Sequence, residues 1–148
     1  GAMGGFLMMN WQPAKIFLGD VGSVPVGFLA GWLLFSLSSE GNVIAAVILP
    51  LYFIIDSSLT LIIRLVKFEK VWEPHRDHFY QKAVRNGKSH SEISFAVAVS
   101  NLLLIGLLAF VDSDFGFWVV ICGLGIVGIL IFWMVAGLNE KKGSSLKR

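Results

Sequence analysis

The sequence predicts an all-α, polytopic membrane helix bundle with four full transmembrane helices and a truncated one before them. Hydrophobic residues make up 55% of the 148 residues and charged residues only 15%, where a soluble domain has about 25% charged residues. Four apolar runs each come close to the about 20 residues that a helix needs to cross the bilayer. They are residues 21–39, 43–63, 93–111 and 115–138. Since no long polar stretch separates them, residues 1–148 are expected to form a single membrane unit.

Residues 1–9 are apolar but too short to span a membrane. We interpret them as the last turns of a helix that begins upstream, although Gly-Ala-Met at the start could also be the scar of a cleaved tag. A signal peptide is not expected, because no basic residues precede the apolar ones. The chain is therefore expected to be part of a longer protein.

A few small or special residues refine this picture. Pro25 lies near the start of its run, where proline is tolerated, whereas Pro50 lies inside a run and should bend that helix. Gly27 and Gly31 permit close helix packing, which we expect to be internal, with a dimer face as the alternative. Cys122 is the only cysteine, so no internal disulfide is expected.

The charges predict an orientation. All twelve Lys and Arg residues fall on one side of the alternating spans: Lys15 in the first loop, seven in residues 64–92 and four in the C-terminal tail. The opposite connections contain Glu40, Asp112 and Asp114 and no basic residue. Because basic residues are retained in cytoplasmic loops, loop 64–92 and the tail are expected to be cytoplasmic. This sorting explains the positive charge without nucleic-acid binding, for which no module is recognisable.

Asp20 is the first candidate functional residue. It stands between Gly19 and Gly22, where the first cytoplasmic loop meets the next apolar run. A carboxylate beside flexible backbone at a helix N-terminus suits a magnesium ion whose other ligands are waters and substrate phosphates. Helix capping by Asp20 or Ser23 is the alternative, since both are good capping residues.

Asp56 lies in the third quarter of an apolar run, roughly 10 Å from its cytoplasmic end at 1.5 Å per residue. A charge at that depth is costly unless it is paired or faces a wet cavity. We therefore expect Asp56 to face the bundle interior, with structural pairing and substrate contact both open. Arg64 follows eight residues later on nearly the same helical face, but about 12 Å further along, so a direct ion pair is not implied.

Loop 64–92 carries seven basic and four acidic residues, which suits anionic headgroups or phosphates. His75, Arg76 and His78 are adjacent within it. Arg76 could bind a diphosphate through its guanidinium fork, and a histidine could donate to the diphosphate or move a proton. Zinc is disfavoured because no cysteine or other suitable ligand lies nearby.

A simpler interpretation is compatible with this one. The same stretch could form an amphipathic helix at the membrane surface, with Trp72, Phe79 and Tyr80 at the interface.

Two blocks carry a resemblance to a known family. PAKIFLGDVGS at residues 13–23 and FEKVWEPHRDHFYQKAV at residues 68–84 resemble the magnesium-aspartate block and the cytoplasmic histidine loop of the polyprenyl-phosphate N-acetylhexosamine-1-phosphate transferases, the glycosyltransferase 4 family. The resemblance covers nearly the whole chain but only the C-terminal portion of a family protein. The upstream half of such proteins carries a paired-aspartate motif and an Asn/Asp-rich loop that this sequence does not contain.

The resemblance implies roles for individual residues. Asp20 corresponds to the metal ligand, with Mg²⁺ as the expected ion and Mn²⁺ as an alternative, and His78 corresponds to the loop histidine. Arg76 joins these two as the third expected catalytic residue. Tyr80 and Gln81 occupy positions where many members have further histidines. Substrate contact or shaping of the site is expected of Lys15, Gly19, Gly22, Ser23 and His75.

The implied function is transfer of sugar 1-phosphate from a UDP-N-acetylhexosamine to undecaprenyl phosphate, with release of UMP. The loop pattern resembles that of members that begin O-antigen or other surface-polysaccharide synthesis. The resemblance also implies a location in the bacterial inner membrane and assembly as a homodimer. The chain alone is expected to be inactive. Alternatives are a non-catalytic membrane module that binds polyprenyl phosphate or a partner subunit and, as the weakest, an ion or solute carrier using Asp56.

Overall fold

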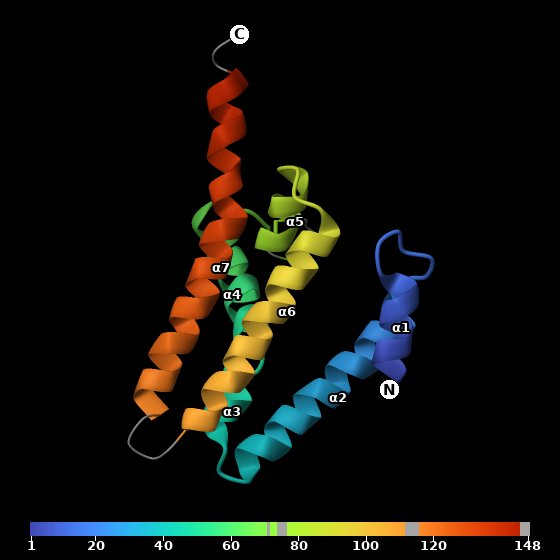
Figure 1. Ribbon diagram of the computed structural model, residues 1–148. Coiled ribbons are helices and arrows are strands. Elements are labelled where there is room, and N and C mark those ends of the chain that lie inside the picture. Colours follow the sequence, from blue (N-terminus) through green and yellow to red (C-terminus); the bar gives the residue numbers. More distant parts are fainter. Residues whose placement is uncertain (71, 74–76, 112–115, 146–148) are drawn as a thin grey trace. The chain divides into compact units, whose positions relative to one another are not determined.

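The computed structural model describes residues 1–148 except 71, 74–76, 112–115 and 146–148. All the secondary structure in the described residues is helical (Figure 1), which confirms the predicted fold class. A short 3₁₀ turn, Leu108–Phe110, follows the sixth α-helix. The α-helices are α1 (Ala2–Asn10), α2 (Gly19–Ser39), α3 (Val43–Ile48), α4 (Leu51–Val66), α5 (Phe79–Arg85), α6 (His90–Leu107) and α7 (Gly116–Ser145).

Among the described residues, three helical stretches are long and apolar enough to cross a membrane. They are Gly19–Ser39, His90–Phe110 and Gly116–Ala136, and they match three of the four predicted spans. The remaining predicted span, residues 43–63, is divided into α3 and α4 at Pro50. Proline lacks a backbone N–H and crowds the preceding turn, so the predicted bend is confirmed. A fourth crossing by this divided segment stays a prediction.

The helix ends follow local chemistry. Pro25 lies within the uninterrupted α2, close to its start, as expected. Helix α6 begins three residues before the predicted span because Ser89 and Glu92 form a reciprocal capping box. The Glu92 backbone N–H donates to Ser89 Oγ at 3.1 Å, and the Ser89 N–H donates to the Glu92 carboxylate at 2.8 Å. Each bond satisfies an amide that the first helical turn leaves unpaired.

The chain forms two compact units, Gly1–Ala46 and Val47–Arg148, each of which is described by itself. In the second unit α6 and α7 lie side by side, and α4 and α5 also pack against α7 (Figure 1). Its core is apolar, with Ile48, Leu104, Val127 and Met134 fully buried. Tyr52 reaches into this core, where its hydroxyl lies 3.9 Å from the sulfur of Met134.

Helix α4 buries one face that is unusually polar. Tyr52, Asp56, Thr60 and Arg64 recur every four residues and are all buried. Residues four apart lie on the same side of an α-helix, so these side chains form one stripe. Burial of a polar group is costly unless a partner compensates for it. The partners of Asp56 and Arg64 lie in the segment that follows α4, whereas the Thr60 hydroxyl has no hydrogen-bond partner among the described residues.

Gly123 allows α7 to approach its neighbours closely. A Cβ atom there would lie 2.9 Å from Ile48 Cδ1, 3.2 Å from Leu51 Cδ2 and 3.4 Å from Leu104 Cδ2. The same atom at Gly128, on the same helix, would meet nothing within 4 Å. The contact of α7 with α3, α4 and α6 therefore depends on the absence of a side chain at position 123.

We expect Gly123→Leu to destabilise the second unit by about 1–3 kcal/mol, because a larger side chain must displace close-packed neighbours. Thermal unfolding in detergent micelles, followed by circular dichroism, measures the effect. Gly128→Leu is the matched control, since it adds the same side chain to the same helix in open space. Equal melting temperatures for the two variants would contradict the packing role of Gly123.

Candidate functional site

The segment that leads to Asp20 folds back onto the end of α1. The Lys15 backbone N–H donates to the Met9 carbonyl at 2.9 Å. The Asn10 side-chain amide donates to the Ile16 carbonyl at 2.8 Å. These bonds close residues 10–16 into a compact turn, and α2 begins three residues after it.

Glycine is required where α2 begins. Gly19 has φ +60°, in the left-handed region that glycine adopts without a steric penalty. Gly22 lies against the Leu18 side chain, where a Cβ atom would come within 2.6 Å of Leu18 Cγ and Cδ1. The two glycines thus shape the turn around Asp20.

Asp20 is exposed in the first turn of α2. The N-cap residue of this helix is Leu18, and no side chain forms a capping hydrogen bond there. The capping alternative is therefore wrong for both Asp20 and Ser23, which lie inside the helix. Ser23 and Lys15 are also exposed. Asp20 thus belongs to the first turn of α2, whose backbone amides lack partners within the helix and favour anions such as phosphate.

A magnesium ion fits this position as a partly protein-bound ion. The described residues contain no group of three or more His, Cys, Asp or Glu side chains that could enclose a metal. Magnesium is commonly held by only one or two carboxylates and completes its octahedron with waters and substrate phosphates. The exposed Asp20 can supply one such carboxylate, so the predicted metal role stays a prediction compatible with the donor present.

The second unit contains a buried aspartate–histidine pair. Asp56 is only 4% exposed, and its Oδ2 lies 2.9 Å from His78 Nδ1. Its other oxygen, Oδ1, accepts the Phe79 backbone N–H at 2.8 Å. Both oxygens of the carboxylate are therefore hydrogen-bonded to residues that lie 22 and 23 positions further along the chain. The structure thus favours pairing for Asp56, one of the two roles left open by its sequence position.

His78 lies directly before α5, as the N-cap residue of that helix. Its ring stacks on Tyr80, with centroids 5.8 Å apart and planes at 22°. Gln81 in turn donates to the Tyr80 hydroxyl at 3.2 Å. Tyr80 thus supports the His78 ring directly, and Gln81 supports Tyr80. The His78 side chain keeps 27% of its surface exposed.

Three predicted surface aromatics have different surroundings. Trp72 and Tyr80 are exposed, as an interfacial segment requires. Phe79 is buried, so its predicted place at the surface is wrong. The reason is the bond from its amide to Asp56, which draws the start of α5 onto α4. Among the described residues of this stretch, a helix is present over Phe79–Arg85.

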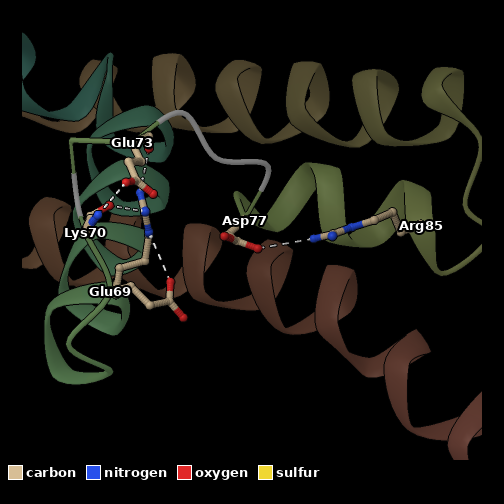
Figure 2. Close-up of polar contacts among 6 residues, drawn as sticks. Glu69, Lys70, Glu73, Asp77 and Arg85 are labelled. Atoms are coloured by element: carbon tan, nitrogen blue, oxygen red, sulfur yellow. Dashed lines mark hydrogen bonds and ion pairs between the residues drawn. The ribbon is translucent and has the colours of Figure 1, made fainter.

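Arg64 organises the chain that follows α4. Its side chain is 7% exposed, and its Nε lies 3.3 Å from Glu69 Oε2. The other guanidinium nitrogens donate to the Glu73 carbonyl at 3.3 Å and to the Lys70 carbonyl. Figure 2 shows these contacts, together with the ion pair between Lys70 and Glu73 at 3.1 Å. Arg64 is therefore a structural anchor for Glu69, Lys70 and Glu73, a role that its sequence position did not reveal.

A further ion pair joins the residue before His78 to the end of α5. Asp77 Oδ1 and an Arg85 guanidinium nitrogen are 3.5 Å apart (Figure 2). Both side chains are well exposed, so the pair contributes little stability. Its position links the residue before His78 to the last turn of α5.

Some predicted site residues fall outside the described part. His75 and Arg76 belong to residues 74–76, so their predicted roles stay predictions. Asp20 lies in the first compact unit and His78 in the second. The expectation that they serve one reaction also stays a prediction.

Sequence comparisons identify relatives of the chain. The glycosyl transferase family 4 model matches residues 1–38, which include the glycine turn at Asp20. A probable undecaprenyl-phosphate N-acetylglucosaminyl 1-phosphate transferase of Bacillus subtilis (strain 168) is 29% identical over 93% of this chain and 40% of that protein. An undecaprenyl-phosphate alpha-N-acetylglucosaminyl 1-phosphate transferase of Pasteurella multocida (strain Pm70) is 28% identical over 87% of this chain and 38% of its own length.

A phospho-N-acetylmuramoyl-pentapeptide-transferase of Sulfurimonas denitrificans (strain ATCC 33889 / DSM 1251) is also similar, with 28% identity over 71% of this chain and 30% of that protein. The chain thus spans 40% or less of the length of these three relatives. No solved structure shows significant similarity to it.

The long apolar helices of the chain make it a multi-pass helical membrane protein. The family model and the relatives confirm its resemblance to the polyprenyl-phosphate N-acetylhexosamine-1-phosphate transferases, the glycosyl transferase family 4 proteins.

Proposed function

We propose that the protein to which this chain belongs transfers sugar 1-phosphate from a UDP-N-acetylhexosamine-type donor to undecaprenyl phosphate. The observation that carries the proposal is the turn that contains Asp20. The family model matches this turn, and the structure explains both of its glycines: Gly19 by its positive φ and Gly22 by its close contact with Leu18. The names of two relatives supply the acceptor lipid, undecaprenyl phosphate, and the transferred group, N-acetylglucosaminyl 1-phosphate.

In the proposed reaction an oxygen of the lipid phosphate forms a bond to the sugar-bearing phosphorus of the UDP-sugar. The bond from that phosphorus to the oxygen bridging the two phosphates breaks, and its electron pair leaves with UMP. The products are a lipid-linked diphosphate sugar and UMP. The balance is the same whether the attack is direct or passes through a covalent enzyme intermediate.

Phosphoryl transfer depends mainly on positioning and on neutralising charge, and the proposed site residues match that need. Asp20 would hold Mg²⁺ or Mn²⁺, and the ion when bound supplies positive charge beside the diphosphate. Arg76 and His78 would bind phosphate oxygens, with His78 also able to take or give a proton. Lys15, Ser23 and His75 would contact the substrates.

The proposed place of the reaction is the cytoplasmic surface of a bacterial inner membrane. UDP-sugars are cytoplasmic, and the phosphate of the acceptor lies at the membrane surface. The positive-inside rule supports a cytoplasmic location for loop 64–92 and the tail, because basic residues are concentrated in both. The products would enter O-antigen, other surface-polysaccharide or cell-wall glycan synthesis, and a homodimer is proposed from resemblance alone.

The test is UMP release from a panel of UDP-N-acetylhexosamines with undecaprenyl phosphate and Mg²⁺. Two proteins are compared: the 148-residue chain, and a chain extended upstream to its natural start. We expect release only from the extended chain, because the upstream carboxylates and half of the lipid groove are needed. Equal release from the 148-residue chain would contradict its proposed inactivity. No release from the extended chain with any donor would favour a non-catalytic module that binds polyprenyl phosphate or a partner subunit.

A further inference from the structure

Asp56 is buried in a way that needs an explanation. It is a carboxylate in the middle of α4, with 4% of its surface exposed. Burial of a charge is costly unless its oxygens receive hydrogen bonds. Here both oxygens do, from the His78 ring at 2.9 Å and from the Phe79 backbone N–H at 2.8 Å.

The bond between Asp56 and His78 constrains the histidine in two respects. A carboxylate oxygen accepts hydrogen bonds, so Nδ1 of His78 must carry the proton that they share. In the neutral ring the lone pair then lies on Nε2, which sets the tautomer. Stacking on Tyr80 restricts rotation of the same ring. The protonation pattern of His78 is thus set by Asp56 on α4, and its ring position by Asp56 together with the neighbouring Tyr80.

From this arrangement we infer that Asp56 is the positioning residue of His78. It orients the imidazole and keeps the proton on Nδ1, so that Nε2 is the nitrogen that acts on a phosphate group. It also holds the start of α5 against α4 through the Phe79 amide. The inference rests on the proposed function for the phosphate, whereas the hydrogen-bond geometry stands independently of it.

Asp56→Asn is a sharp test, because the Phe79 amide dictates how the new side chain must lie. An N–H group needs an acceptor, so the asparagine must turn its carbonyl oxygen toward Phe79. Its NH₂ group then faces His78 Nδ1 and donates to it. The variant thus keeps a hydrogen bond to Phe79 and one to His78, but the histidine proton moves from Nδ1 to Nε2.

The first readout is the tautomer itself, measured on the 148-residue chain in lipid nanodiscs. Imidazole ¹⁵N chemical shifts distinguish protonated from unprotonated ring nitrogens. The chain has three histidines, and the His78 signals are assigned by their loss in His78→Ala. We expect a protonated Nδ1 in the wild type and an unprotonated Nδ1 in Asp56→Asn. An unprotonated Nδ1 in the wild type, or no change in the variant, would overturn the inference.

The second readout is a double-mutant cycle on UMP release by the extended chain. We expect Asp56→Asn to lower kcat about 10- to 100-fold, as loss of an orienting partner does, with KM changed little. In the His78→Ala background the same substitution should lower kcat less than about twofold, since the group that it positions is gone. If the two substitutions lower kcat independently, so that their fold-effects multiply in a protein that is still active, the inference is overturned.

Thr60→Val is the matched control for both readouts. Thr60 lies one turn from Asp56 on the same buried face of α4, and its hydroxyl has no hydrogen-bond partner among the described residues. We expect it to leave the tautomer and kcat unchanged. Failure of the proposed function is distinguishable from failure of this inference. If the proposed function is wrong, the wild-type extended chain releases no UMP, whatever the tautomer of His78.

Discussion

Replacement of Asp20 by asparagine is expected to lower UMP release by the extended chain about 10²- to 10³-fold, the size of effect seen when one charge-stabilising group is removed from an active site. Asparagine keeps the shape of aspartate but lacks the negative charge that attracts a divalent cation. The Mg²⁺ concentration for half-maximal activity should therefore rise as well. Steady-state UMP release over a Mg²⁺ titration measures both effects.

The structure offers a control for this experiment on the same helix. Glu40 is exposed and follows α2 as its C-cap residue, so Glu40→Gln removes one negative charge at the opposite end. We expect its activity and its Mg²⁺ dependence to equal those of the wild type. Helix content of Asp20→Asn should also be unchanged, because the carboxylate makes no capping bond. Wild-type Mg²⁺ dependence in Asp20→Asn would contradict the metal-ligand role.

Arg64→Ala is expected to destabilise the second unit by about 3 kcal/mol, since hydrogen bonds to a charged group each contribute about 1.5–3 kcal/mol and burial makes their loss costly. Two backbone carbonyls and the Glu69 carboxylate lose their donor. The melting temperature should fall by about 6–12 °C for a chain of this size. The segment after α4 should also become sensitive to protease at Lys67 and Lys70.

Lys70→Ala distinguishes the anchor from its surroundings. Arg64 binds the backbone carbonyl of Lys70, so removal of the exposed Lys70 side chain leaves that bond in place and breaks only the surface ion pair with Glu73. Such pairs contribute about 0–1 kcal/mol. We expect Lys70→Ala to melt close to the wild-type temperature. A similar loss for both variants would show that the Arg64 bonds do not anchor the loop.

Local features of the site were predictable from the sequence. The glycines around Asp20 indicated a turn before a helix, and the structure shows why, through the φ of Gly19 and the contact of Gly22 with Leu18. Pro50 indicated a bend, and the helix divides there. These features follow from a few neighbouring residues, because backbone conformation near glycine and proline is governed by local sterics.

The partners of Asp56 and Arg64 were not predictable in the same way. Depth in an apolar run indicated that Asp56 faces the bundle interior and left pairing and substrate contact open, and the partner His78 lies 22 positions away. Arg64 suggested a place in a phosphate-binding loop, whereas it binds two carbonyls of its own chain. Backbone carbonyls are present at every residue, so no sequence pattern marks the ones that a buried arginine selects.

The all-α membrane class, the family resemblance and the local conformation at Gly19 and Pro50 follow from the amino-acid sequence alone. These depend on hydropathy over about 20 residues and on sterics within a few residues. The pairing of Asp56 with His78 and the burial of Phe79 depend instead on how the folded chain packs. Those outcomes require the chain after α4 to fold back onto the polar face of that helix, where burial makes each unpaired polar group costly and so selects its partner.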